Sequence, residues 1–320
     1  MKNYILWAIE ALQKNGYQLT SPHPELVQQA PWSEVFRFST QEGNIYLKKT
    51  PPALAIEVQV IKTLKEKFQM SVPVIIENNL NERCFLMKDM GIPLRMFFKQ
   101  GFNPDILIKV LENYGHFQYA TTNHFPLFLN MGVPDWRLAK LPFLYQELVQ
   151  QTVLLKQFGL TQEEINKCQD LIGPFQNICE KLSEYNIPDT FCHCDFNDNN
   201  VLVNPKTHRT TIIDLGEVAI THPFFSLLNM LHHIKKNFKL TQQQYETLQH
   251  LAFKPWLQLE PASRLKIIMT CIHQCSLIQA MLGIYQLMLC VDPIYFEAVA
   301  REGRFARKCR EWLNQSIKSV

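Results

Sequence analysis

Apolar and polar positions in the first ninety residues predict a small β-rich region. Two short apolar runs, one at Val35–Phe38 and one at Ile45–Lys48, flank the polar turn Gln41–Asn44, a pattern typical of a β-hairpin. The other predicted elements here are an amphipathic helix at 1–13, further strands within 24–48, a helix carrying Leu54, Val58, Ile61 and Leu64 at helical spacing, and strands at 72–76 and 84–87.

A polar break with Gly and Pro, Lys88–Pro93, separates this region from a mostly helical chain, and we predict a lobe boundary there. Apolar periodicity predicts helices at about 104–120, 142–158, 161–185, 223–237, 241–252, 263–290 and 293–318. The third opens with Thr161–Glu164, a possible capping box, and the last with Asp292-Pro293. Two strand-like runs, Val201–Val203 and Thr211–Ile213, interrupt the helices and predict a small hairpin.

Composition excludes several classes of protein. In 320 residues, 47% are hydrophobic and 19% charged, which favours a folded core over disorder. The net charge of +3 is too small to indicate a nucleic-acid or anionic-membrane partner. The chain shows neither a signal-peptide pattern nor 18 consecutive apolar residues, so we expect a soluble, cytoplasmic protein. Nine cysteines, an odd number, are then expected to be thiols.

The candidate chemistry lies in residues 191–217, where Phe191–Leu202 is followed by Ile212–Glu217. Phosphoryl transfer needs a carboxylate to orient and deprotonate the attacking hydroxyl, and divalent metal to neutralise phosphate oxygens. Mg²⁺ prefers hard oxygen ligands, few of them from protein. Asp195 fits the base, and Asn200, five residues later, fits a metal ligand. Asp214, directly after a predicted strand, fits the second metal ligand.

These two linked motifs resemble the aminoglycoside phosphotransferase / choline kinase family, small-molecule kinases with a protein-kinase-like fold. The family's catalytic loop reads His-Gly-Asp-x-x-x-x-Asn, and a later strand ends Ile-Asp-x-Gly-Glu or similar. The positions that match are His193, Asp195, Asn200, Asp214 and Gly216. Cys194 stands where the family usually has Gly, and Ser226 where it commonly has an Asp that braces the catalytic loop.

The resemblance implies an α+β, two-lobed fold. A β-rich, nucleotide-binding N-lobe would span 1–87, a hinge 88–93, and a helical C-lobe with the catalytic loop and acceptor site 94–320. It also implies ATP and Mg²⁺ as cofactors and a small-molecule hydroxyl as acceptor.

Two other interpretations of the motif remain. Asp and Asn are common in turns, where they bond local backbone groups, and this could explain Asp198 and Asn199. It does not explain the strand-like runs on both sides. Cys192, His193 and Cys194 could bind metal, but adjacent ligands rarely close a zinc site without a second pair, and the sequence has no CxxC.

On the nucleotide side, the resemblance implies that Lys48 contacts the ATP phosphates and is held by Glu57 on the next helix. Lys49 is the rival; strand alternation puts it on the opposite face from Lys48, and periodicity alone does not decide between the two. The phosphate loop is expected near Pro31–Glu34, where Ser33 could contact phosphate although the loop contains no Gly. Adenine is expected at the hinge, and the candidates there are Met87, Lys88 and Met90.

The acceptor side carries weaker signals. Residues 251–320 hold five acidic and nine basic residues, which does not favour a strongly cationic acceptor. On the last helix, Arg301, Arg304 and Lys308 share a face that is either solvated or contacts an anion. Cys271 and Cys275 share a helix face and His273 points away from them, so a buried thiol pair is expected there rather than a metal site.

The sequence therefore predicts an ATP-dependent phosphotransferase acting on a hydroxyl of an aminoglycoside, sugar or amino alcohol. The alternative is a kinase-like nucleotide-binding regulatory module with weak or no catalysis, which the missing loop Gly, Cys194 and Ser226 would favour. A protein or peptide acceptor is a third option, although no activation segment of protein-kinase length follows Asp214.

Overall fold

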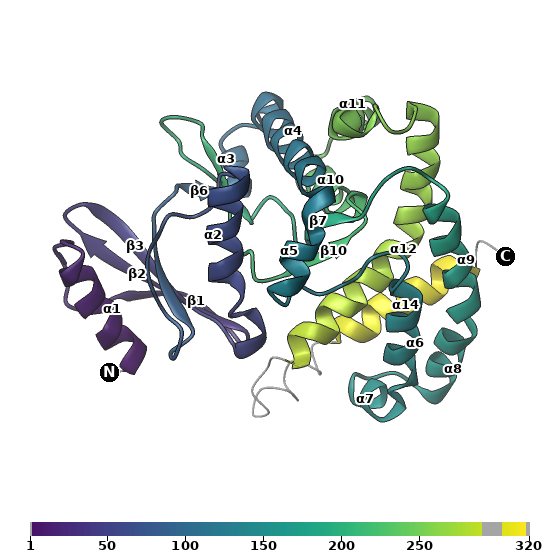
Figure 1. Ribbon diagram of the computed structural model, residues 1–320, viewed down its shortest axis with the longest axis horizontal. Coiled ribbons are helices and arrows are strands. Elements are labelled where there is room, and N and C mark those ends of the chain that lie inside the picture. The colour runs from purple at the N-terminus through teal and green to yellow at the C-terminus, as the bar shows by residue number, and fades with distance from the viewer. Residues whose placement is uncertain (1, 290–302, 318–320) are drawn as a thin grey trace. The chain divides into compact units, whose positions relative to one another are not determined.

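The computed structural model describes residues 2–289 and 303–317, which form two compact units. The first contains residues 2–97 and 199–216, and the second contains 98–198, 217–289 and 303–317. The first is built around strands and the second around helices (Figure 1), so the fold class is α+β, as predicted. The first unit includes the 199–216 hairpin, which the sequence division at 88–93 places with the helices; that division stays a prediction.

A five-stranded antiparallel sheet, in the order β1-β2-β3-β5-β4, forms the centre of the first unit. Its strands are β1 (Glu25–Ala30), β2 (Ser33–Thr40), β3 (Gly43–Lys49), β4 (Ile75–Asn79) and β5 (Cys84–Lys88). The predicted hairpin is confirmed, because β2 and β3 pair through to Thr40↔Gly43 at the turn. The strand predicted at 72–76 begins only at Ile75, since Pro73 has no N–H to donate to a ladder.

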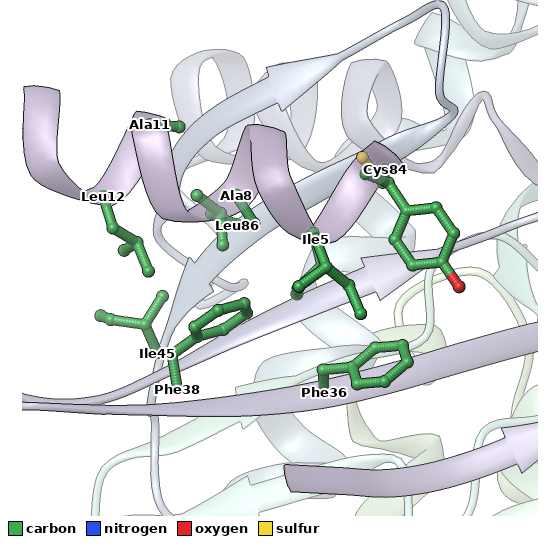
Figure 2. Close-up of a cluster of buried hydrophobic side chains, with 11 residues drawn as sticks. Ile5, Ala8, Ala11, Leu12, Phe36, Phe38, Ile45, Cys84 and Leu86 are labelled. Carbon is green, nitrogen blue, oxygen red and sulfur yellow. The ribbon is translucent and has the colours of Figure 1, made fainter. Parts of the chain in front are cut away.

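Helix α1 (Asn3–Lys14) confirms the predicted N-terminal helix and covers one face of this sheet. Its apolar side, which includes Ala8 and Leu12, packs on Phe38, Ile45 and Leu86 from three strands (Figure 2). Burying this apolar surface stabilises the unit and fixes which side of β3 faces α1. The alternate residues of β3 must then face the other way.

Helix α2 (Glu57–Phe68) lies on the opposite face of the sheet from α1 (Figure 1). A short 3₁₀ helix, η1 (Pro52–Leu54), connects it to β3. Proline at the start of η1 is compatible with a first helical turn but not with a continuing central strand. The strand therefore ends at Lys49, and Glu57 falls in the first turn of the helix that follows.

A second sheet in the first unit joins β6 (Ile92–Pro93), β8 (Val201–Val203) and β9 (Thr210–Ile212). The predicted 201–213 hairpin is thus confirmed, and part of the predicted hinge is a strand that leads into α3 (Leu94–Lys99). Gly91 makes this pairing possible. Its φ is 126°, and a Cβ there would lie 2.2 Å from the carbonyl oxygen of Val203, so no other residue fits without backbone movement.

The second unit is mainly helical. Its helices are α4 (Pro104–Thr121), η2 (Thr122–His124), α5 (Phe125–Asn130), α6 (Leu141–Gln150), α7 (Thr152–Gln157), α8 (Gln162–Asp170), α9 (Ile172–Ser183), α10 (Phe224–Phe238), α11 (Gln242–Phe253), η3 (Lys254–Trp256), α12 (Ala262–Leu289) and α14 (Arg304–Ile317). The Thr161–Glu164 capping box is confirmed. The predicted start of the last helix at Asp292-Pro293 lies outside the described residues.

Two predicted helices are each divided in the structure. The 142–158 helix breaks at Gln151, whose ψ of 55° is not helical. The 161–185 helix breaks at Leu171, because Pro174 can occupy a first helical turn but not a helix interior. Apolar periodicity continues across both breaks, so the sequence pattern alone did not show them.

A two-stranded sheet of β7 (Thr190–His193) and β10 (Val218–Thr221) lies within the helical unit and was not predicted. Both strands are fully buried, so they lack the alternation that marks a half-exposed strand. Cys194 N–H extends the pairing by donating to the Glu217 carbonyl at 2.8 Å. The pairing of β7 with β10 therefore holds the two ends of segment 194–217 beside each other.

Helix α12 is long and apolar enough to span a membrane by length and composition, with a mean hydropathy of 1.6 over an 18-residue window. This test is looser than a run of 18 consecutive apolar residues, because polar residues such as His273 and Gln274 interrupt the apolar run of the helix. In the structure 56% of that window is buried, which is the pattern of a core helix. Leu265, Ile272 and Ile278 are among its fully buried residues.

Candidate active site

A buried lysine near the end of β3 lies between two carboxylates of the first unit. The Nζ atom of Lys48 is 2.8 and 2.7 Å from the two carboxylate oxygens of Glu57 and 2.5 Å from Oδ1 of Asp214. Burial alone would lower the pKa of Lys48, but Asp214 and Glu57 raise it above its ordinary value. The ammonium therefore stays charged, and the structure forms the predicted Lys48–Glu57 pair.

The two candidate lysines occupy opposite faces of β3. Lys48 is 7% exposed and faces α2, whereas Lys49 faces α1, with its Nζ 4.1 Å from the ring centre of Tyr4 and 3.9 Å from Glu82. The apolar contacts of Ile45 and Leu47 with α1 decide this, because they fix the register of the strand. Lys48, and not Lys49, therefore meets the carboxylates.

Asp214 follows β9 in a left-handed conformation, with φ at 63°. Aspartate adopts this region more readily than most residues, at a modest cost in strain. The next residue, Leu215, donates its N–H to Glu57 Oε1 at 3.1 Å. A Cβ on Gly216 would lie 3.3 Å from Leu54 Cβ, so a small residue suits this approach. The backbone after Asp214 is thus fixed against α2.

Asn200 and Asp214, the two predicted metal ligands, lie on neighbouring segments of the backbone. The Ile213 N–H donates to the Asn200 carbonyl at 3.0 Å, which places the backbone of Asn200 beside the residue before Asp214. The Asp214 side chain is 36% exposed, so it can reach a ligand while it contacts Lys48. Carboxylate and amide oxygens are the donors that a hard divalent cation prefers, so this donor set fits Mg²⁺.

The remaining predicted nucleotide residues divide between the two faces of the sheet. Val35 and Phe85 are the cross-strand partners of Lys48, so Ser33 and Met87, two residues along their strands, share its face. Lys88 instead pairs with Ile45 on the α1 face, and its N–H donates to the Val74 carbonyl at 3.0 Å. The Lys88 side chain and N–H are therefore not placed to contact a nucleotide beside Lys48.

Met90 and the predicted phosphate loop are the other nucleotide candidates in the first unit. Met90 is half-buried in the loop between β5 and β6. The predicted phosphate loop is a turn of two residues, Pro31-Trp32, closed by the pairing of Ala30 with Ser33. The roles of Ser33, Met87 and Met90 toward a nucleotide stay predictions.

In the second unit, Asp195 is half-buried in the turn that follows β7. Its N–H donates to Nδ1 of the His193 ring at 3.2 Å, and its carbonyl accepts from the side chain of Asn197 at 3.0 Å. Both backbone groups of Asp195 are therefore fixed within the loop, which limits the positions its carboxylate can take.

Side chains of α10 form hydrogen bonds with this loop and with the strand end before it. Ser226 Oγ donates to the His193 carbonyl at 2.9 Å, and Asn229 donates to the Phe196 carbonyl at 3.2 Å. The carboxylate of fully buried Asp198 accepts from the Asn237 side chain on α10 at 2.9 Å, so its bonds are not confined to its own turn. Asn229 and Asn237 follow Ser226 on one helix, but without the tertiary structure nothing in their spacing connects them to residues 193–198.

A comparison with protein-family models identifies the family of the chain. The model of the phosphotransferase enzyme family matches residues 29–256, more than two thirds of the chain. This chain belongs to the phosphotransferase enzyme family. The protein is therefore a phosphotransferase, as its two linked motifs predict. A search of curated proteins found no match.

Solved structures show that the fold of this phosphotransferase is that of small-molecule kinases, as predicted. An ethanolamine kinase of Plasmodium vivax is 13% identical, with a TM-score of 0.62 over 96% of this chain and 88% of that one. An aminoglycoside phosphotransferase of Streptomyces rimosus, in complex with ADP and streptomycin, is 14% identical, with a TM-score of 0.54 over 85% and 98%. An amicoumacin kinase in complex with AMP-PNP and Ca²⁺ is 11% identical, with a TM-score of 0.59 over 98% and 94%.

The cysteines of the phosphotransferase that seemed able to bind metal have other surroundings. Cys192 is fully buried; it accepts from Gln118 and lies 3.6–3.7 Å from the carbonyl oxygens of Thr221 and His222. Cys271 and Cys275 are buried whereas His273 is exposed, which confirms the predicted thiol pair on α12. Among residues 2–289 and 303–317, no three His, Cys, Asp or Glu side chains cluster around one point.

Charged residues in the C-terminal part of the phosphotransferase are largely engaged with one another. Glu260 is buried and accepts from Asn186 N–H and contacts Arg264 at 3.1 Å, and Glu311 pairs with Lys308 at 2.7 Å. Arg310 contacts Glu164 at 2.6 Å. The basic last helix is thus partly explained by ion pairs within the unit; Arg301 lies outside the described residues.

Asp189, just before β7, should make the stability of the phosphotransferase depend on pH. Its Oδ1 is buried without a hydrogen-bond partner in the described structure, and burial raises its pKa to about 7. A hydrogen bond from the Leu138 backbone and the nearby Arg137 lower this pKa only partly, and Arg137 is already paired with Asp135 at 2.7 Å. A raised carboxyl pKa means that the native state binds the proton more tightly than the unfolded chain does.

Stability contributed at Asp189 should therefore be fully present below about pH 4 and lost as pH rises toward 7, by up to about 4 kcal/mol. We expect Asp189→Asn to raise the urea midpoint clearly at pH 8 and less at pH 5. An equal gain at both pH values, or a loss at pH 8, would contradict this assignment.

Proposed function

We propose that this phosphotransferase transfers the γ-phosphate of ATP to a hydroxyl group of a small molecule. The observation that carries the proposal is the buried Lys48, charged and held by Glu57 beside Asp214. A buried ammonium with two carboxylates is costly to maintain for stability alone. It suits a site in which a fixed positive charge must contact phosphate oxygens.

The residues of the chain divide the work as follows. Lys48 contacts the phosphates, and Glu57 keeps its ammonium in place. Asn200 and Asp214 would hold Mg²⁺, which when bound neutralises charge on the phosphate oxygens. Asp195 orients the acceptor hydroxyl and takes its proton on a carboxylate oxygen as the oxygen attacks phosphorus. ADP and AMP-PNP in the similar kinases support a nucleotide donor, and Ca²⁺ in one of them supports a divalent cation.

For the acceptor, we propose amino alcohols and sugars before polycationic aminoglycosides. The names of the similar proteins include an ethanolamine kinase and a complex with streptomycin. A polycation needs carboxylates that are not already engaged. Within residues 251–289 and 303–317, the two acidic side chains, Glu260 and Glu311, both lie in ion pairs.

The proposal is tested by following ADP release and phosphorylated product with Mg·ATP and a panel of amino alcohols, sugars, nucleosides and aminoglycosides. We expect at least one class to give stoichiometric ADP and product. A thermal shift with Mg·ATP but no product from any class would favour a kinase-like nucleotide-binding module instead. The absence of any shift at millimolar Mg·ATP would refute nucleotide use.

A further inference from the structure

Two helices hold the peptide groups of His193, two residues before Asp195. The His193 N–H donates to the hydroxyl oxygen of Tyr114 on α4 at 2.8 Å. The Ser226 hydroxyl on α10 donates to the carbonyl of the same His193 at 2.9 Å. Two helices thus meet at the last residue of β7.

The Tyr114 hydroxyl accepts from the His193 N–H, and the Ser226 hydroxyl donates to the His193 carbonyl. The two side chains therefore hold the N–H and the C=O of one residue.

Both contacts with His193 are buried. Tyr114 is 1% exposed, and His193 and Ser226 are fully buried. Burial raises the pKa of Tyr114 well above its usual value, so its hydroxyl is protonated at neutral pH. In such a low-dielectric setting, removal of either partner leaves a buried peptide group without its hydrogen bond.

Two further contacts connect His193 and Tyr114 with the segment around Asp195. The His193 ring accepts the Asp195 N–H at 3.2 Å, so the position of His193 sets the backbone of Asp195. The Tyr114 ring also stacks on Phe196, with centroids 3.9 Å apart and planes 19° apart. Tyr114 therefore touches the loop on both sides of Asp195, through its hydroxyl before it and its ring after it.

We propose that Tyr114 is a positioning residue, which together with Ser226 holds the His193 peptide and so sets the place of the Asp195 carboxylate. The proposal rests on the phosphotransferase function proposed above. It explains how the loop is braced although Ser226 stands where the resembled family commonly has Asp: Ser226 holds the His193 carbonyl, and Tyr114 accepts the His193 N–H.

The test is Tyr114→Phe, which keeps the ring on Phe196 and removes only the hydroxyl. Tyr145→Phe is the matched control, because Tyr145 is as deeply buried and its hydroxyl is also hydrogen-bonded, to the Cys168 carbonyl and Trp312. We expect Tyr114→Phe to lower kcat at least about 10-fold with KM for ATP unchanged, and Tyr145→Phe to leave kcat unchanged. An unchanged kcat in Tyr114→Phe would overturn the proposal.

A second variant tests the other contact with His193. We expect Ser226→Ala to lower kcat by a similar factor, and the double variant to be no worse than the poorer single one, because both changes release the same residue. Effects that multiply would show that the two side chains act independently and would overturn their joint role.

Amide hydrogen exchange separates failure of this proposal from failure of the proposed function. The exchange of the His193 amide, followed in a peptide spanning 190–198, should rise at least about 10-fold in Tyr114→Phe and stay unchanged in Tyr145→Phe. If the wild-type protein showed no turnover but Tyr114→Phe raised this exchange, the contact of Tyr114 with His193 would stand and the proposed function would fail. If Tyr114→Phe kept normal turnover and unchanged exchange, the positioning role of Tyr114 alone would fail.

Discussion

Replacing Asp195 with Asn is expected to lower kcat about 10³-fold while the Kd for Mg·ATP changes less than about twofold. Asparagine fills the same volume and can still orient a hydroxyl, but its amide cannot take the proton that the attacking oxygen loses. The groups proposed to contact ATP, namely Lys48, Glu57 and Asp214, are untouched by the change. Steady-state kinetics and calorimetric titration of ATP measure the two quantities.

Asp170→Asn is the matched control for loss of one negative charge, since Asp170 is exposed at the end of α8. It should behave as wild type in both assays. If Asp195→Asn turned over at the wild-type rate with a working acceptor, the base would have to be another group. If it lost ATP binding as well, Asp195 would serve the nucleotide rather than the acceptor.

Replacing Lys48 with Met should abolish measurable turnover and also lower the free energy of unfolding by about 3–5 kcal/mol. Methionine has a similar length but leaves the 2%-exposed Glu57 carboxylate buried without its counter-ion. Denaturant unfolding and kinetics would record the two losses. Lys49→Met is the matched control, because that lysine is partly exposed on the other face and should cost less than about 1 kcal/mol.

The double variant Lys48→Met/Glu57→Gln separates the two effects. Removing the charge of Glu57 should recover much of the lost stability, since no unpaired carboxylate is then buried at that position. Activity should stay absent, because no cation remains to contact the phosphates. Recovery of activity in the double variant would show that Lys48 serves the fold and not the reaction.

The sequence was informative wherever a local pattern carries the signal. The β2–β3 hairpin, α1 and the 201–213 hairpin follow from apolar runs, turns and periodicity, and the structure has each of them. The same patterns missed the β7–β10 sheet and the breaks at Gln151 and Leu171. Fully buried strands lack alternation, and apolar periodicity persists across a short break, so local pattern contains no record of either.

For the site, the sequence by itself determined the chemical groups: Asp195, Asn200 and Asp214 at fixed spacing, and a lysine at the end of β3. The resemblance implied Lys48, and the tertiary structure shows why Lys48 rather than Lys49 meets the carboxylates: contacts of Ile45 and Leu47 with α1 set the face of the strand. It also placed the Lys88 side chain on the α1 face and revealed Tyr114, 79 residues from His193 in the chain. Spacing along the chain can predict which groups share a loop. It cannot predict which distant helix contacts that loop, because that contact depends on how the helices pack.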